Sequence, residues 1–369
     1  MSENLTLPVQ QGTSATSTEP LLEVKGLTKH FPIYGGFPIK RKVGAVQAVD
    51  GVDLTVGVGE SVGLVGESGC GKSTTGRLIT RLLEPTAGQI TYAGRDITRA
   101  NRRQLAPVRS EIQMIFQDPY SSLNPRQTVG SIIKAPMEVN GINPEGGREK
   151  RVRELLELVG LNPEHYNRFP HEFSGGQRQR IGVARALALN PKLIVADEPV
   201  SALDVSIQAQ VVNLLQKVQD ELGIAFVFIA HDLAIVRHFS QRVAVMYLGK
   251  VVEVGDRDSI YNRPRHPYTH ALLSAVPEVQ VDDDAEQRER IRLSGDVPSP
   301  IHPPSGCRFR TRCWKAQDKC ATEEPPLVQI SGNHDGHLTA CHFPEEPTTE
   351  VRAEDVVMDP ALKALESEG

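Results

Sequence analysis

The fold of this chain is decided by the stretch Gly66-Glu67-Ser68-Gly69-Cys70-Gly71-Lys72-Ser73. An apolar segment, residues 62–65, precedes it, and residues 74–83 after it favour a helix. Glycines let the backbone wrap around phosphate oxygens, and the N–H groups at the start of a helix point toward them. Lys72 can reach the terminal phosphates, and Ser73 can ligate Mg²⁺. The apolar segment and the helix favour a cradle for a nucleoside triphosphate over an ordinary glycine-rich turn.

The composition is that of a globular protein without a surface that coats nucleic acid. The chain has 369 residues, of which 39% are hydrophobic, and a net charge of -5. This length suggests about two domains, and the charge argues against nucleic-acid partners, which need clustered Lys and Arg. No stretch approaches the roughly 18 apolar residues that span a bilayer, and the first residues lack a signal-peptide pattern. We expect the chain to stay in the cytosol and to reach a membrane only through a partner.

Before the phosphate loop, the chain begins with a polar leader, residues 1–20, that we expect to be disordered. A strand then opens at residues 21–24, and residues 28–46 carry glycines, prolines and a basic run that favour a loop. An aromatic side chain just ahead of a phosphate-binding core can stack on a purine, so Phe31 is the candidate platform for adenine. The alternative is a loop aromatic that packs on its own domain.

Downstream of the loop, strand and helix patterns alternate. Strands are predicted at residues 88–97 (a hairpin), 111–116, 193–196, 224–230 and 243–247, with a helix at 205–222. Residues 125–173 read as helical, with an apolar face on residues 148–160. The pattern predicts an α/β fold with a mostly parallel sheet, an inserted helical segment, and ligands bound at the carboxyl ends of the strands.

Two adjacent carboxylates, Asp197 and Glu198, end the apolar segment 193–196. In a phosphate site the first can hold Mg²⁺ through water, and the second can polarise the attacking water as a general base. Paired acids at a strand end are weak evidence alone, since a solvated turn also carries them. Their position downstream of a phosphate loop favours the catalytic interpretation.

A second anion site is predicted at Ser174-Gly175-Gly176-Gln177, which precedes a helix. A serine cap and two glycines expose N–H groups at the positive end of the helix dipole. One phosphate loop does not need a second anion site in the same chain. We therefore expect this segment to bind the γ-phosphate held by another subunit.

In these residues the chain resembles the ATP-binding subunits of ABC transporters. The matching motifs stand in the family's order: Walker A ending at Thr74 (66–74), the Q-loop glutamine Gln117, the signature (174–177), Walker B with the catalytic glutamate (Asp197, Glu198), the D-loop ending at Asp204, and the switch histidine His231. Residues 117–126 and 265–273 further resemble the dipeptide/oligopeptide importer branch. The resemblance covers roughly residues 21–344.

The resemblance implies a P-loop NTPase core with a mostly parallel sheet, antiparallel edge strands, an inserted helical subdomain and a small cysteine-containing C-terminal extension. It places the nucleotide-binding domain at 21–263, the helical subdomain at about 125–180, the extension at 264–344 and a disordered acidic tail at 345–369.

It also implies an ATPase that energises import of dipeptides, oligopeptides or related solutes from the cytoplasmic face of the membrane. Each ATP would lie between the Walker A of one subunit and the signature of the other, with Gln117 sensing Mg²⁺ and water and His231 steadying the γ-phosphate. The implied partners are a second ATP-binding subunit, favoured as a paralogue, two transmembrane permease subunits and, indirectly, an extracytoplasmic solute-binding protein.

Four cysteines, Cys307, Cys313, Cys320 and Cys341, lie close together late in the chain. In a reducing compartment such a group points to metal before disulfide, but the spacing matches neither zinc pairs nor ferredoxins. Some members of the resembled branch associate a similar extension with a [4Fe–4S] cluster, which the resemblance therefore implies here in a structural role. Zinc and unligated thiols stay open as alternatives. Cys70 sits in the phosphate loop, where a small side chain suffices.

Two other functions compete with transport. Soluble, non-transport ABC ATPases usually fuse two ATPase modules in one chain, whereas this chain has one phosphate loop and one signature. A redox-sensing protein with a vestigial ATPase is disfavoured because Lys72, Asp197, Glu198 and His231 are all present.

Overall fold

The computed structural model of the protein describes residues 19–36, 41–275, 291, 293, 295–331, 333 and 336–346. Most of the predicted leader and acidic tail, residues 1–18 and 347–369, lies outside the described residues.

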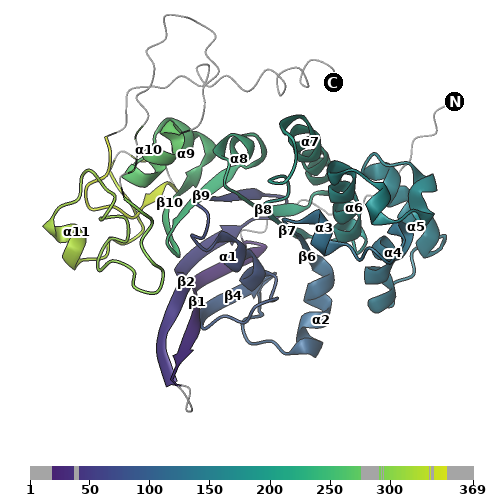
Figure 1. The fold of residues 1–369 in the computed structure, drawn as a ribbon, viewed down its shortest axis with the longest axis horizontal. Helices are drawn as coiled ribbons and strands as arrows, with labels where there is room; N and C mark the ends of the chain where they lie inside the picture. Colours follow the sequence, from purple (N-terminus) through teal and green to yellow (C-terminus); the bar gives the residue numbers. More distant parts are fainter. Residues whose placement is uncertain are drawn as a thin grey trace, which may run out of the picture.

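Two sheets form the framework of the described part of the chain (Figure 1). The larger sheet has, in spatial order, β11 (Val328–Gln329), β12 (Leu338–Thr339), β10 (Lys250–Asp256), β9 (Arg242–Tyr247), β3 (Ser61–Val65), β8 (Ala225–Ala230), β7 (Leu193–Asp197) and β6 (Ile112–Ile115). The smaller sheet has β2 (Arg41–Val56), β1 (Leu22–Gly35), β4 (Ala87–Tyr92) and β5 (Arg95–Asp96).

The helices are distributed over the whole described chain. They are α1 (Lys72–Ile79), α2 (Arg102–Glu111), α3 (Pro119–Ser122), α4 (Val129–Val139), α5 (Gly147–Leu158), α6 (Gly175–Leu187), α7 (Val205–Leu222), α8 (Leu233–Phe239), α9 (Arg257–Asn262), α10 (Pro267–Ser274) and α11 (Asp318–Thr322), with short 3-10 turns η1 (Pro163–Asn167) and η2 (Pro170–Glu172).

The larger sheet confirms the predicted mixture of strand directions. From β6 through β7, β8 and β3 to β9 each pairing is parallel, whereas β9–β10, β10–β12 and β12–β11 are antiparallel. The central strands are buried on both faces, as parallel strands covered by helices are. In β8, Phe226 and Phe228 enter one core cluster, while Val227 and Ile229 enter the other. The sheet therefore separates two hydrophobic cores and presents the carboxyl ends of its parallel strands at one edge.

The prediction of a loop over residues 28–46 is wrong. β1 and β2 pair as a long antiparallel ribbon from Leu22 opposite Val56 to Gly35 opposite Arg41. The outer part of this ribbon is largely exposed, so its sequence lacks the alternation of apolar and polar residues that marks a half-buried strand. Long-range pairing between the two strands, not local sequence preference, sets the structure here.

The helical insertion is confirmed. α4, α5 and α6 pack together beside the sheet (Figure 1), and the apolar face predicted for residues 148–160 is buried at Val152, Leu155 and Leu156. Gly160 follows α5 with a φ of 71°, which is the left-handed conformation that favours glycine after a helix.

The C-terminal segment returns to the larger sheet through β12, which pairs with β10 at Glu253 opposite Thr339. Phe309, in the stretch between two of the late cysteines, is buried in the main core. The segment therefore depends on the core of the rest of the chain, as expected for a region with few apolar residues.

Candidate active site

The phosphate loop connects β3 to α1, and its shape requires glycine at two points. Gly66 has a φ of 151°, and a Cβ there would lie 2.1 Å from the carbonyl oxygen of Met246. Gly71 has a φ of 109°, and a Cβ there would lie 2.1 Å from the carbonyl oxygen of Ala48. Larger residues at either position would push the loop away from the sheet edge.

Lys72 is buried beneath this loop, and its ammonium group turns back onto the loop's own backbone. Nζ donates to the carbonyl oxygens of Gly66, at 2.7 Å, and Glu67, at 3.0 Å. Ser68 and Gly69 form the exposed tip, and burial raises the pKa of the Cys70 thiol, which therefore stays neutral. The charge of Lys72 is thus held at the inner side of the loop, where phosphate oxygens would lie.

Ser73 and Asp197 come together from α1 and the end of β7. The Ser73 hydroxyl donates to Oδ1 of Asp197 at 2.6 Å. Asp197 is only 1% exposed, and its burial raises the pKa of the carboxyl, while the bond from Ser73 opposes that rise. Hydroxyl and carboxylate oxygens are the ligands that Mg²⁺ prefers, so this donor pair fits the predicted metal role.

Glu198 stands at the centre of three strand ends. Its Oε2 accepts a hydrogen bond from Nε2 of Gln117, at 2.9 Å, and lies 3.4 Å from Nδ1 of His231. Gln117 follows β6, Glu198 follows β7 and His231 follows β8. The parallel order of these strands brings together residues that are far apart in sequence, as predicted.

The backbone of Glu198 is strained. Its φ is 45°, which is uncommon for a residue with a side chain and costs on the order of 1–2 kcal/mol. Its N–H is satisfied by the carbonyl oxygen of Ile229 at 2.9 Å. Strain of this kind collects at active sites, where surrounding structure holds a side chain in place.

The signature segment has the predicted helix-cap geometry but lies apart from the phosphate loop. Ser174 caps α6: its hydroxyl accepts from the Gln177 N–H at 3.3 Å, and the Gln177 side chain accepts from the Ser174 N–H at 3.0 Å. Among the described residues no hydrogen bond or ion pair joins 174–177 to 66–74, and α1 and α6 are separated in Figure 1. Asp204 is exposed at the start of α7. Ser174 and Asp204 are therefore exposed at positions away from the phosphate loop of the same chain.

Phe31 lies on β1 opposite Val46, and the residue is 36% exposed. Nζ of Lys29 lies 5.2 Å from the ring centroid, in cation–π contact. An exposed ring on this ribbon agrees with an adenine platform, and that role stays a prediction.

The four late cysteines gather around one cavity of about 10 Å³, which Cys307, Cys313, Cys320 and Cys341 line together. Burial raises the pKa of Cys313 to about 11 and that of Cys341 to about 12. In the described part of the chain no three His, Cys, Asp or Glu side chains are arranged to hold a metal ion. The thiols suit iron or zinc chemically, but a cavity of this size holds about one water molecule. A cluster there would require these loops to rearrange.

Sequence reasoning missed two contacts to the phosphate loop, from Tyr268 in α10 and from Arg312 beside Cys313. Neither residue belongs to a nucleotide-binding motif, and both lie about 200 or more positions from the loop. Only the C-terminal run 265–273, which the importer resemblance singled out, pointed toward Tyr268.

Comparison with known protein families identifies two regions. The family described as ABC transporter matches residues 49–201, and the family described as oligopeptide/dipeptide transporter, C-terminal region, matches residues 252–320. The second match includes three of the four late cysteines but ends before Cys341.

The chain is similar to curated proteins over most of its length. It is 52% identical to the oligopeptide transport ATP-binding protein AppF of Bacillus subtilis, over 89% of this chain and 99% of the relative. It is 49% identical to the dipeptide transport ATP-binding protein DppF of Haemophilus influenzae, over 87% of this chain and 96% of the relative.

Solved structures support the same fold. The ATP-binding cassette MJ0796, solved as a dimer in a post-hydrolysis state with ADP and phosphate, has a TM-score of 0.57 and 30% identity, over 64% of this chain and 98% of that one. The cassette cbiO1 of Clostridium perfringens, part of the ABC transporter complex cbiONQ, has a TM-score of 0.57 and 28% identity, over 66% of this chain and 90% of that one. The helices of the described chain are too short or too polar to cross a bilayer.

Proposed function

This chain belongs to the ATP-binding proteins of ABC transporters, in the oligopeptide/dipeptide group, and from that membership we propose that it energises import of dipeptides or oligopeptides. It is an ABC-type ATPase. The peptide cargo is proposed because relatives that cover almost the same length are named for oligopeptide and dipeptide transport.

The meeting of Gln117 and His231 at one oxygen of Glu198 is the observation that carries the catalytic part of the proposal. Glu198 is the proposed general base, because its carboxylate can accept the proton of a water molecule that attacks the γ-phosphate. Gln117 orients this carboxylate and the water, and His231 steadies both the water and the phosphate. Their shared contact supports the assignment because each residue arrives on a different strand.

The remaining candidates bind the nucleotide in this proposal. Lys72 neutralises phosphate charge, and the N–H groups of residues 66–74 surround the phosphate oxygens. Ser73 and Asp197, with Gln117, would hold Mg²⁺, which neutralises charge on the phosphates when bound. Phe31 would stack on the adenine.

We propose that ATP is enclosed only when a second ATP-binding subunit, a paralogue or a copy, supplies its signature. The outward-facing Ser174 cap supports this, because its N–H groups lie apart from the phosphate loop of the same chain. Asp204 would lie at the same subunit interface. The related cassette MJ0796 was solved as a dimer bound to ADP and phosphate, which supports a dimeric arrangement.

The proposed partners in the membrane are two permease subunits, served indirectly by an extracytoplasmic solute-binding protein. An open groove of about 400 Å³ lies between α4 and the junction of α2 with β6, next to the segment that follows Gln117, and Val139 in its lining is 86% exposed. A cytoplasmic helix of a permease docked there would couple movement of the Q-loop to the channel. The protein would then lie on the cytoplasmic face of the membrane.

We also propose the division into a nucleotide-binding domain (21–263, with its helical subdomain at about 125–180) and a cysteine-containing extension (264–344). An iron–sulfur cluster on Cys307, Cys313, Cys320 and Cys341, with zinc as the alternative, is part of this proposal. The gathering of the four side chains around one cavity supports it, and the loops that carry them would rearrange to admit the cluster. Iron and zinc contents of protein purified without oxygen decide between the two metals, and absence of both would remove the site.

The transport proposal is tested by capturing the tagged full chain from detergent-solubilised membranes and identifying the proteins that copurify. We expect two membrane-spanning subunits and a second ATP-binding subunit. A homodimer recovered only from the soluble fraction would overturn the transport assignment and favour a non-transport ABC ATPase.

A further inference from the structure

The phosphate loop is tied to the C-terminal segment by Arg312, the residue before Cys313. Its guanidinium makes two contacts with the carboxylate of Glu67: Nη1 to Oε2 at 2.7 Å and Nη2 to Oε1 at 3.2 Å. The Arg312 side chain is only 8% exposed. A paired contact of this kind fixes the orientation of both groups as well as their distance. Glu67 is therefore held in one position as long as residues 307–320, which carry three of the late cysteines and are called the cysteine segment below, keep their fold.

The backbone of the same loop residue is held from the same side. The Glu67 N–H donates to the hydroxyl of Tyr268 at 2.9 Å. Tyr268 is fully buried, and its ring contacts those of Tyr247 and Phe309, with centroids 4.7 Å and 5.3 Å away. Since Phe309 lies in the cysteine segment, that segment supports the loop both directly and through Tyr268.

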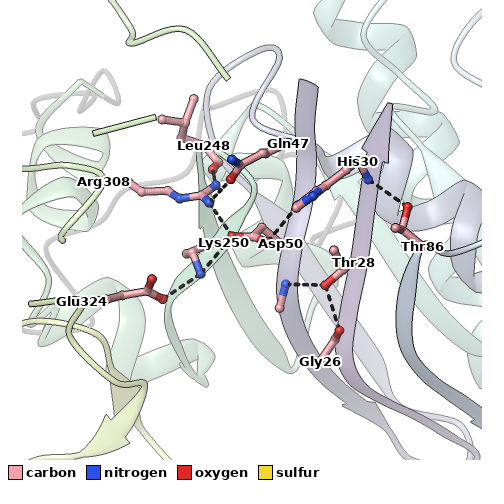
Figure 2. Close-up of polar contacts among 11 residues, drawn as sticks. Gly26, Thr28, His30, Gln47, Asp50, Thr86, Leu248, Lys250, Arg308 and Glu324 are labelled. Carbon is pink, nitrogen blue, oxygen red and sulfur yellow. Dashed lines mark hydrogen bonds and ion pairs between the residues drawn. The ribbon is translucent and has the colours of Figure 1, made fainter. Parts of the chain in front are cut away.

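A second arginine of the segment holds the ribbon that carries the candidate adenine platform. Figure 2 shows Arg308 reaching Gln47 and Asp50 of β2 and the carbonyl oxygen of Leu248. The contact with the Gln47 side chain is 2.7 Å. Asp50 in turn contacts His30 of β1 at 2.9 Å, one residue before the ring at position 31. The cysteine segment thus contacts both the phosphate loop, through Arg312, and the ribbon that carries Phe31, through Arg308.

The charge of Glu67 makes the first contact the more consequential for ATP. Glu67 belongs to a loop that binds a polyanion, and an unpaired carboxylate there would repel the phosphates. Arg312 cancels this charge without occupying the loop. It also limits the motion of a loop that is glycine-rich, and a loop ordered beforehand loses less entropy when it binds a ligand.

We infer that Arg312 is a positioning residue of the nucleotide site, which orients and neutralises Glu67 and so makes ATP affinity depend on the folded cysteine segment. This inference rests on the proposed function to the extent that ATP is the ligand of the loop. In the described part of the chain, no hydrogen bond or ion pair joins Arg312 to Gln117, Glu198 or His231. It acts on the site through its two contacts with Glu67.

The experiment compares Arg312→Met with Arg310→Met in the full chain, purified with its partners. Arg310 lies two residues away in the same segment, and its guanidinium donates to the carbonyl oxygen of Ser305 at 2.9 Å. We expect Arg312→Met to raise the Kd and the KM for ATP about tenfold, the loss that corresponds to about 1.4 kcal/mol. Its kcat should change less than about twofold, because the groups at Glu198 are untouched. Arg310→Met should leave all three values unchanged.

A double-mutant cycle with Glu67→Gln separates this role from general loss of stability. If Arg312 acts through Glu67, the double variant binds ATP about as well as Glu67→Gln alone. Arg312→Lys keeps the charge without the two-pronged contact, and an intermediate loss is expected even if the methionine variant folds poorly.

Three outcomes would overturn the inference: an Arg312→Met affinity within about twofold of the parent, an equal loss from Arg310→Met, or a full loss from Arg312→Met in the Glu67→Gln background. A parent chain that binds no ATP would instead refute the proposed function. ATP binding by the parent with an unaffected Arg312→Met variant refutes only the positioning role.

Discussion

Replacement of Glu198 by glutamine should separate ATP binding from ATP hydrolysis. The substitution preserves the size of the side chain and its backbone position, so packing at the end of β7 should survive. It removes the negative charge and one of the two oxygens, including the capacity to accept a proton from water. Because Oε2 is the atom that Gln117 contacts at 2.9 Å, the glutamine amide must also turn its oxygen toward Gln117 to keep that bond.

The expected loss follows from the role of a general base. Such a group contributes about 10²–10⁴-fold to the rate, or roughly 3–5 kcal/mol of the activation barrier. ATP affinity should be retained or improve, since Lys72 and Ser73 are unchanged and a negative charge near the γ-phosphate is removed. The variant should therefore accumulate as an ATP-bound dimer.

The assay is phosphate release in a single turnover, with ATP affinity and association state measured on the same samples. Glu221→Gln is the matched control, because Glu221 lies in an exposed pair with Lys217 at the far end of α7. Hydrolysis by Glu198→Gln at the parent rate would refute the assignment of the base. Equal loss of binding and hydrolysis would show that the residue holds the nucleotide rather than activating water.

Three further predictions concern stability and the loop. Glu253 is fully buried and accepts hydrogen bonds from three groups. Glu253→Ala should therefore lower the unfolding free energy, measured by chemical denaturation, by about 3–5 kcal/mol, and Glu253→Gln should cost clearly less. Equal losses of stability in the two variants would contradict this prediction. Gly71→Ala should abolish ATP binding, because its Cβ would meet the carbonyl oxygen of Ala48. By contrast, Gly182 lies in an interior turn of α6 with open space at its Cβ, so Gly182→Ala should raise the free energy of unfolding by about 1 kcal/mol. A loss of stability at Gly182 would show hidden crowding. Burial lowers the pKa of His266 to about 4, whereas an unfolded histidine titrates near about 6.5. The unfolded state therefore binds a proton in that window that the folded state does not, and stability should fall by up to about 3 kcal/mol as the pH drops from 6.5 to 4. His266→Asn, which keeps an acceptor for the helix cap, should flatten this slope, and an unchanged slope would refute the cause.

The phosphate-binding loop and the catalytic group were predictable because each of their residues follows an apolar strand. Parallel strands deliver their carboxyl ends to one edge, so Asp197 could approach Ser73 and His231 could approach Glu198 once the strand order was right. The ribbon of residues 28–46 was not predictable, since its exposed outer part carries no alternating pattern and its pairing depends on distant residues.

The contact between Arg312 and Glu67 lay beyond sequence reasoning for a different reason. Arginine usually lies on the surface, and the sequence around it gives no indication of which residue it will contact. Arg312 and Glu67 are also 245 positions apart. Only the return of the chain through β12 to β10 places the cysteine segment against the loop. The contact between Arg312 and Glu67 therefore depends on tertiary structure, and no sequence motif predicts it.

Peptide uptake driven by ATP tests the central claim most directly. The chain would be reconstituted in proteoliposomes with its copurified permease and ATP-binding partners and the solute-binding protein. Uptake of radiolabelled dipeptides and oligopeptides would be measured with ATP on the side of the membrane that carries this subunit, or on the opposite side. The account predicts accumulation only when ATP reaches the subunit, and none with Glu198→Gln. ATP hydrolysis by the complete complex with no uptake of either class of peptide would contradict it.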